Sequence, residues 1–249
     1  DFNAFMERET GLRILNLASP GTGPLYNRFV LEQFLSKLRA ANLLYIVDSF
    51  AFYSPTWNEE RFADAKLIRR MPWDSAVARR LFDYSRRAGV DPRAVLDYVS
   101  GFSKINNRER FEPDIWEGEK QFDRTFRPSA AATRSRIAYL YPSPPQESVF
   151  LRYLNEFDAL LATAERHGMR AVVIKTPVPS QFYKRLPEEE NFDAAIARLL
   201  AEHGVQFQDF SLAMDEPRFY FDTDHLNRTG LTEFFERHLK AILLPPDSR

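Results

Sequence analysis

Short apolar runs that are typical of buried strands alternate with amphipathic helical stretches at both ends of the chain. Near the N-terminus, residues 13–18 and 43–47 predict two strands, and the stretch between them predicts a helix. Near the C-terminus, residues 171–174 and 205–210 predict two more strands. Strands and helices that alternate in this way indicate an α/β fold, in which helices cover both faces of a parallel sheet.

The helices predicted around these strands have apolar residues at the three- and four-residue spacing of a helix face. Two of them end at a His-Gly pair, where a histidine in the last turn suits the helix dipole and glycine suits the C-cap. The predicted helices cover roughly residues 1–10, 25–38, 148–167, 192–203 and 229–243.

The central segment, about residues 54–147, lacks strand patterns. Helices are predicted near 63–70, 73–88 and 92–102, and a run rich in Trp, Phe and Arg follows Asn106 without clear periodicity. We therefore expect a single α/β domain over residues 1–249, with a helical insertion at about 54–147 that caps one edge of the sheet.

The central segment is also basic, with 17 Lys and Arg residues against 11 Asp and Glu between positions 61 and 136. A solvated helical surface accounts for this excess, and an anionic or envelope-protein partner is the alternative interpretation. Its three tryptophans raise a similar choice between ordinary packing and a sugar-binding wall; they are Trp57, Trp73 and Trp116.

Composition excludes several classes of protein. The 34 Lys and Arg residues nearly balance the 35 Asp and Glu residues, so the chain is not a globally basic nucleic-acid binder. The absence of cysteine excludes disulfides, thiolate metal sites and a cysteine nucleophile. No apolar run reaches the roughly 18 residues that a membrane helix needs, and no signal-peptide pattern is visible.

The loop at residues 219–227 carries the pattern that most resembles a catalytic site. Asp222 and His225 stand three residues apart, so the carboxylate can hold one ring nitrogen and leave the other to face a nucleophile. Of the four histidines, only His225 is predicted to lie in a polar loop. The alternative is structural, with Asp222 or Asp224 capping the last helix.

Two further interpretations involve ligands. Asp222, Asp224 and His225 offer oxygen and imidazole ligands for a divalent metal, although three ligands so close in one turn rarely converge. The turn at residues 21–23 opens a helix, as phosphate sites do, but it lacks the spacing of both dinucleotide and Walker motifs. We therefore expect no metal and no cofactor.

The run at residues 221–230, followed by an amphipathic helix, resembles the last block of the SGNH/GDSL hydrolase superfamily. The turn at residues 16–21 resembles its glycine-containing second block, and residues 172–179 and 205–211 resemble its later strands. The similarity is greatest to the envelope branch, which includes the teichoic-acid D-alanyl transfer and alginate O-acetylation proteins. It covers roughly residues 1–55 and 148–243.

This resemblance implies a flavodoxin-like three-layer fold and a Ser-His-Asp triad. Asp222 takes the place of the orienting carboxylate and His225 that of the general base, while Gly21 would offer a backbone N–H to the oxyanion. The family's third block supplies an Asn, but this chain has Asp48 and Ser49 at that point. Ser49 is the donor that could replace the missing amide.

The nucleophile is the main departure from the family pattern. The family's serine lies in the first block, after the first strand, whereas this chain opens with a predicted helix. We expect that strand and its serine to lie upstream of Asp1. Ser49 is the second candidate, because residues 47–50 resemble the G-D-S-L block after an apolar strand. The third interpretation is that no nucleophile is present.

The resemblance implies a serine esterase or O-acyltransferase that acts on acyl esters, with water or a cell-envelope polysaccharide hydroxyl as acceptor. It also implies a periplasmic or membrane-associated location outside the cytoplasm, although the composition alone fits the cytoplasm equally well. The alternative is a non-catalytic binding or assembly module that kept the fold and lost the nucleophile.

Overall fold

A computed structural model describes residues 2–64, 73–101 and 122–244. These residues form a mixed α/β fold around one parallel sheet of three strands, ordered β1 (Asn42–Ile46), β2 (Arg170–Lys175) and β3 (Gln206–Asp209). Tyr45 is opposite Val173 in the first pairing, and Val173 is opposite Phe207 in the second. Three of the four predicted strands are thus confirmed.

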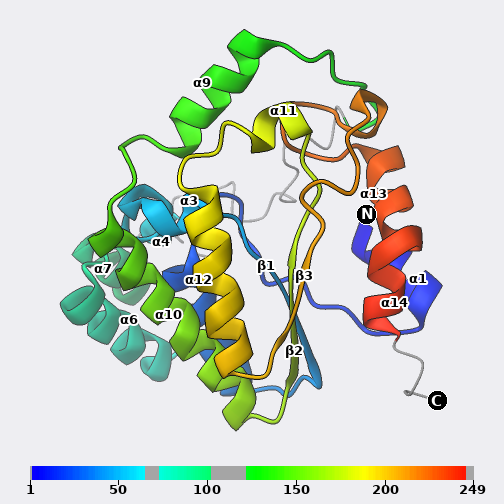
Figure 1. The fold of residues 1–249 in the computed structure, drawn as a ribbon. Coiled ribbons are helices and arrows are strands. Elements are labelled where there is room, and N and C mark those ends of the chain that lie inside the picture. The colour runs from blue at the N-terminus through cyan, green and yellow to red at the C-terminus, as the bar shows by residue number, and fades with distance from the viewer. Residues whose placement is uncertain (1, 65–72, 102–121, 245–249) are drawn as a thin grey trace.

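Helices cover both faces of this sheet (Figure 1). One face packs against helices from separate parts of the chain, namely α2 (Pro24–Leu35), α10 (Glu147–Arg166) and α12 (Glu189–Glu202). The other face packs against elements from near the two ends of the chain, namely α1 (Phe2–Thr10), α13 (Arg228–Phe234), a π-helix (Phe235–Leu239) and α14 (Lys240–Leu243).

Successive side chains of β2 enter two different cores, because side chains alternate between the faces of a strand. Val173 packs with Phe157 in the core beneath α10, whereas Val172 and Ile174 pack with Phe235 in the core beneath the C-terminal helices. Burial on both faces explains why β2 has a continuous apolar run rather than an alternating pattern.

The strand predicted at residues 13–18 is absent, so this prediction was wrong. None of these residues is buried, and Leu15 is 59% exposed. Part of the backbone is satisfied locally, since the Ala18 N–H donates to the Asn16 side chain and the Ile14 N–H donates to Glu7. An apolar run becomes a strand only where a neighbouring strand accepts its hydrogen bonds, and the described sheet offers none here.

The final helix begins at Arg228, directly after Asn227, whose side chain accepts a hydrogen bond from the Gly230 N–H at 2.9 Å. Asn227 therefore caps this helix, and neither Asp222 nor Asp224 does so. The predicted extent of residues 229–243 is close to that observed, but a π-helical turn at Phe235–Leu239 interrupts the α-helix.

Wherever the central segment is described, its regular elements are helices, joined by turns and irregular loops, and it contains no strand there. Its helices pack a further core against α2, built around Phe29, Phe62 and Tyr84. The predictions for 73–88 and 92–102 are confirmed, while much of 63–70, Asn106 and Trp116 lie outside the described residues. The short helix α3 (Phe50–Tyr53) precedes this segment. The helical elements within it are the 3₁₀ turn Pro55–Trp57, α4 (Glu59–Asp64), α6 (Ser75–Ala88), α7 (Pro92–Ser100) and α9 (Ala130–Leu140).

Two short helical elements complete the described fold near the carboxyl ends of the strands. These are α11 (Ser180–Tyr183) and the 3₁₀ turn Pro217–Phe219. Among the described helices, none has the length and apolar character required to cross a membrane.

Candidate active site

A cavity of about 520 Å³ lies at the carboxyl edge of the sheet. Its lining combines the turn before α2, the loops after β1 and β2, helix α9 and the loop at residues 219–227, here called the site loop. Gly21, Ser49 and His225, three of the predicted site residues, therefore border one space. This convergence is what a parallel sheet produces at the ends of its strands.

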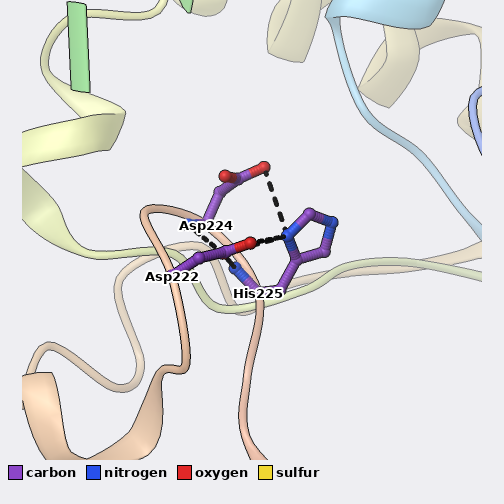
Figure 2. Close-up of side chains that lie close together, drawn as sticks. All are labelled: Asp222, Asp224 and His225. Atoms are coloured by element: carbon purple, nitrogen blue, oxygen red, sulfur yellow. Dashed lines mark hydrogen bonds and ion pairs between the residues drawn. The ribbon is translucent and has the colours of Figure 1, made fainter. Parts of the chain in front are cut away.

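Within the site loop, the carboxylate of Asp222 hydrogen-bonds to the imidazole ring of His225 (Figure 2). The Nδ1 atom of His225 lies 2.9 Å from Oδ2 and 3.0 Å from Oδ1 of Asp222. The same Oδ1 accepts the backbone N–H groups of Asp224 and His225, at 3.1 and 2.8 Å. A carboxylate only accepts hydrogen bonds, so Nδ1 is the donor and Nε2 is the nitrogen that can accept a proton.

Electrostatics favour charge on both partners. Burial acts to lower the pKa of His225, but the hydrogen bond to Asp222 and the charges of Asp224 and Asp222 outweigh it, and the net pKa is raised above its ordinary value. For Asp222, burial acts to raise the pKa, and the contacts with His225 and two backbone N–H groups lower it on balance. Such a pair stabilises an imidazolium, which a general base becomes after it takes a proton.

Arg136 completes this arrangement, and sequence reasoning did not single it out. Its Nε and Nη2 atoms lie 2.9 and 2.8 Å from the two carboxylate oxygens of Asp224, and Nη2 lies 3.5 Å from Nε2 of His225. The basic excess of the central segment was the only sequence signal for it. A guanidinium fixed beside Nε2 of His225 can stabilise negative charge that develops next to this nitrogen.

Gly21 has the left-handed φ of +68°, and a Cβ there would lie 3.1 Å from the Trp57 ring. Trp57 is buried and donates to the Leu140 carbonyl at 2.7 Å, so its indole packs into the protein as well as lining the cavity. In the described part of the chain, the Gly21 N–H donates no hydrogen bond. Trp73, by contrast, is 63% exposed and does not line the cavity.

Ser49 is buried, and its hydroxyl is engaged in a polar network whose members Glu189 and Lys175 also line the cavity. It hydrogen-bonds to the Tyr141 hydroxyl at 2.6 Å and donates to the Glu189 carboxylate. The described contacts thus direct the Ser49 side chain towards this network. Ser49 lines the cavity at the start of α3.

The same network holds a buried lysine. Lys175, at the end of β2, donates to Glu189 and to Asp193 on α12, both at 2.6 Å. Burial acts to lower the pKa of Lys175, but the charge of Glu189 and hydrogen bonds to both carboxylates raise it on balance. In the sequence, Lys175 directly follows the strand predicted at residues 171–174, and nothing there indicates its acidic partners.

The ligand atoms of Asp222, Asp224 and His225 do approach within 4.8 Å of one another, as the metal interpretation requires. However, Arg136 takes both oxygens of Asp224, and Asp222 takes Nδ1 of His225. These groups therefore neutralise one another without an ion. In the turn at residues 21–23, the Thr22 and Gly23 N–H groups donate to the Ser19 and Trp57 carbonyls, which leaves those two groups unavailable to a phosphate.

In a comparison with known families, residues 152–239 match the model of the DltD protein family. This region, roughly a third of the chain, includes β2, β3, Asp222 and His225, whereas Gly21, Ser49 and Arg136 lie outside it. The DltD family serves in the D-alanylation of teichoic acids and belongs to the cell envelope. No curated protein matches the chain.

Proposed function

We propose that this protein is an envelope acyl-transfer enzyme of the SGNH type, which moves or hydrolyses acyl esters through a Ser-His-Asp mechanism. The observation that carries the proposal is the Asp222–His225 pair, which lies within the region similar to the DltD family and whose histidine lines the cavity. The similarity to a D-alanylation family supports a cell-envelope polymer as the acceptor.

In the proposed reaction, a serine hydroxyl attacks the ester carbonyl and His225 takes its proton at Nε2. The ester oxygen then leaves with that proton, and the acyl group remains on the serine. An acceptor hydroxyl or water attacks this acyl-enzyme, again giving its proton to His225, and the released serine recovers the proton. Asp222 holds the ring and its tautomer throughout.

The oxyanion of both tetrahedral intermediates needs donors in the cavity. Gly21 offers its backbone N–H, and Arg136 offers guanidinium N–H groups beyond those bound to Asp224. Arg136 therefore takes the role of the family's third-block asparagine, which this chain lacks. The Ser49 hydroxyl, which is bound to Tyr141 and Glu189, is the weaker candidate for that role.

The proposal assigns the whole chain to one SGNH-like α/β domain, in which residues 54–147 form the helical insertion. The insertion supplies Arg136 to the site, and its basic surface is the proposed contact for an envelope partner. We place the protein outside the cytoplasm, in keeping with the location of the DltD family.

Hydrolysis of p-nitrophenyl acetate by the full-length protein tests the mechanism. We expect His225→Ala to lose at least 100-fold in kcat/KM and Asp222→Asn about 10- to 100-fold. His203→Ala is the matched control, because His203 pairs with Asp158 and does not line the cavity. Equal turnover by wild type and His225→Ala would contradict the proposal.

A second candidate function is a binding module without turnover, and the engaged hydroxyl of Ser49 supports it. The same assay separates the two functions. The Ser49→Ala variant tests in addition whether Ser49 is the nucleophile. If Ser49→Ala keeps full activity, another serine attacks. If wild type binds an acyl ester but turns it over no faster than His225→Ala, the binding module is the better description.

A further inference from the structure

A groove of about 490 Å³ lies between α2 and α6, the latter a helix of the central insertion. Helix α6 lines it with Arg80, Tyr84 and Arg87, which recur after four and three residues and therefore share one face of the helix. Helix α2 contributes Arg28 and Glu32. Among the described residues, those that line this groove are all different from those that line the candidate active site.

The charges on the α2 side of the groove are already paired within the protein. Arg28 donates to Glu32 at 2.9 Å and to Glu156 of α10 at 2.8 Å. Tyr84 of α6 is buried, and its hydroxyl donates to the other carboxylate oxygen of Glu32 at 3.4 Å. These contacts hold α2 and α6 beside the groove and leave Arg28 with little capacity to bind a ligand.

The α6 side has guanidinium groups without carboxylate partners. Within the described ranges, Arg80, Arg86 and Arg87 form no ion pair, and all three line the groove. The carboxylate that α6 adds to the groove is Asp83, so three positive charges meet one negative charge on this side. The Nη1 atom of Arg80 is buried without a hydrogen-bond partner. A guanidinium is always charged, and a buried charged donor without a partner costs free energy that a bound anion would offset.

Arg87 is positioned by an aromatic ring rather than by a carboxylate. Its Cζ atom lies 4.4 Å from the centroid of the Tyr84 ring, and Tyr84 packs against Phe29 of α2 with 5.4 Å between the ring centroids. A cation–π contact of this kind orients a guanidinium without using a carboxylate acceptor for its N–H groups. Arg87 is therefore oriented before a ligand arrives, which lowers the entropic cost of binding.

This arrangement of donors favours a phosphate with several terminal oxygens. Seven positions separate Arg80 from Arg87, which is about 10 Å along the helix, so the two guanidinium groups would approach one small anion from different directions. A phosphate monoester offers three terminal oxygens in different planes, whereas a carboxylate offers two in a single plane. A phosphodiester also has only two terminal oxygens and carries one charge instead of nearly two.

We propose that the groove between α2 and α6 binds a phosphate monoester or free phosphate, with Arg80 and Arg87 as its principal contacts. This site is separate from the candidate active site, and the inference does not depend on the proposed function. The ligand is either a small soluble phosphate or the headgroup of a lipid such as phosphatidic acid, because both present the same terminal phosphate.

Calorimetric titration of the full-length protein with methyl phosphate at pH 8 tests this inference. At that pH the monoester carries two charges, because its second pKa is about 6. We expect wild type to bind methyl phosphate roughly tenfold more tightly than dimethyl phosphate or acetate. We expect the double variant Arg80→Gln and Arg87→Gln to bind methyl phosphate roughly tenfold more weakly than wild type.

The matched control is the double variant Arg79→Gln and Arg93→Gln. These two arginines are exposed on α6 and α7, do not line the groove, and carry the same total charge as Arg80 and Arg87. We expect this control to bind methyl phosphate within about twofold of wild type, because salt screens exposed charges outside the groove.

Co-sedimentation with phosphatidylcholine vesicles that contain phosphatidic acid separates the two sources of the ligand. Vesicle binding that is lost in the Arg80→Gln and Arg87→Gln variant assigns a lipid headgroup, and any other vesicle result assigns a soluble phosphate. Either source requires that methyl phosphate binds.

Three results would overturn the inference. These are equal binding of methyl phosphate, dimethyl phosphate and acetate by wild type, unchanged affinity in the Arg80→Gln and Arg87→Gln variant, and an equal loss in the control variant. An amide NMR spectrum shows whether the double variant is folded. If it is not, the single variant Arg87→Gln is judged by the same criteria, because Arg87 is exposed and its substitution should be tolerated.

Discussion

Arg136 on helix α9 holds Asp224, 88 positions later in the chain, through three hydrogen bonds of 2.8–3.0 Å. Both side chains are mostly buried, with 25% and 11% of their surfaces exposed. Charged pairs with this two-pronged geometry are stronger and more directional than single contacts. These hydrogen bonds therefore connect the central helical segment to the loop that carries His225.

We expect Arg136→Gln to raise the pKa of His225. Arg136 lowers this pKa by its positive charge, and its removal also leaves the charge of Asp224 uncompensated beside the ring. Both effects favour the imidazolium. An NMR titration of the imidazole signals measures the shift directly, whether or not the protein is catalytically active.

Arg61→Gln is the control for this titration, because Arg61 also lines the cavity but donates to the Tyr139 hydroxyl rather than to Asp224. The pKa of His225 should stay close to the wild-type value in that variant. A lower or unchanged pKa in Arg136→Gln would contradict the assignment. Arg136→Lys keeps the charge but loses the paired geometry, so we expect an intermediate value.

The sequence predicted those parts of the site that depend on neighbouring residues. Asp222 and His225 are three residues apart, so their contact follows from a single turn once the loop is recognised. The strands at β1 and β2 were predicted because apolar residues next to one another indicate burial in a parallel sheet. Each of these predictions used information within about ten residues.

The rest of the site depends on the path of the chain through space. Ser49 and Glu189 are 140 positions apart, and neither residue type indicates the other. At residues 13–18 the sequence predicted an element that is absent rather than missing one that is present. Their pattern favours a strand, but strand pairing requires a neighbouring strand that the local sequence does not specify. Arg136 was missed for both reasons. Its partner Asp224 is 88 positions away, and its own segment has no clear periodicity from which a helix could be predicted.

The Asp222–His225 pair should stabilise the fold in one pH range. The raised pKa of His225 adds stability that is complete below its ordinary value of 6.5 and is lost as the pH rises through the raised value. The lowered pKa of Asp222 adds stability that is complete above 3.8 and is lost as the pH falls through the lowered value. Both contributions are therefore present between about pH 4 and 6.5.

Urea unfolding of wild type and Asp222→Asn tests this pH dependence. The two side chains are 38% and 37% exposed, so solvent screening should limit the difference in unfolding free energy to below about 1 kcal/mol. We expect the largest difference near pH 5 and a smaller one at pH 8 and above. A difference that grows with rising pH would show that another group controls it.

Gly230 lies in the first turn of α13, where the fold leaves no room for a side chain. A Cβ there would lie 2.1 Å from the Phe219 carbonyl oxygen and 3.0 Å from Cδ2 of Leu226. We expect Gly230→Ala to lower the unfolding free energy by about 3 kcal/mol, because backbone would have to move. Gly204→Ala is the control, since it has a φ of +61° but nothing within 4 Å, and should cost about 1 kcal/mol. Equal losses in the two variants would exclude the steric explanation.

The last prediction concerns Lys175, which lines the cavity and whose expected role is to stabilise the fold there rather than to take part in the reaction. The side chains of Lys175 and Glu189 are only 6% and 5% exposed, and Asp193 shares the same ammonium group. We expect Lys175→Met to lower the unfolding free energy by about 3–5 kcal/mol, because it leaves a buried carboxylate unpaired.

Adding Glu189→Gln to this variant should restore part of the loss, since the unpaired charge is then removed as well. Lys240→Met is the control, because Lys240 forms an exposed pair with Glu236 that should contribute less than about 0.5 kcal/mol. All four proteins can be compared by urea unfolding at pH 7. If Lys175→Met costs no more than Lys240→Met, the buried network does not stabilise this edge of the sheet. The double variant could instead be less stable than Lys175→Met. In that case the hydrogen bond that Glu189 accepts from Ser49 contributes more to stability than removal of the unpaired Glu189 charge does. The glutamine amide keeps the shape of the Glu189 side chain but is a weaker hydrogen-bond acceptor than the carboxylate.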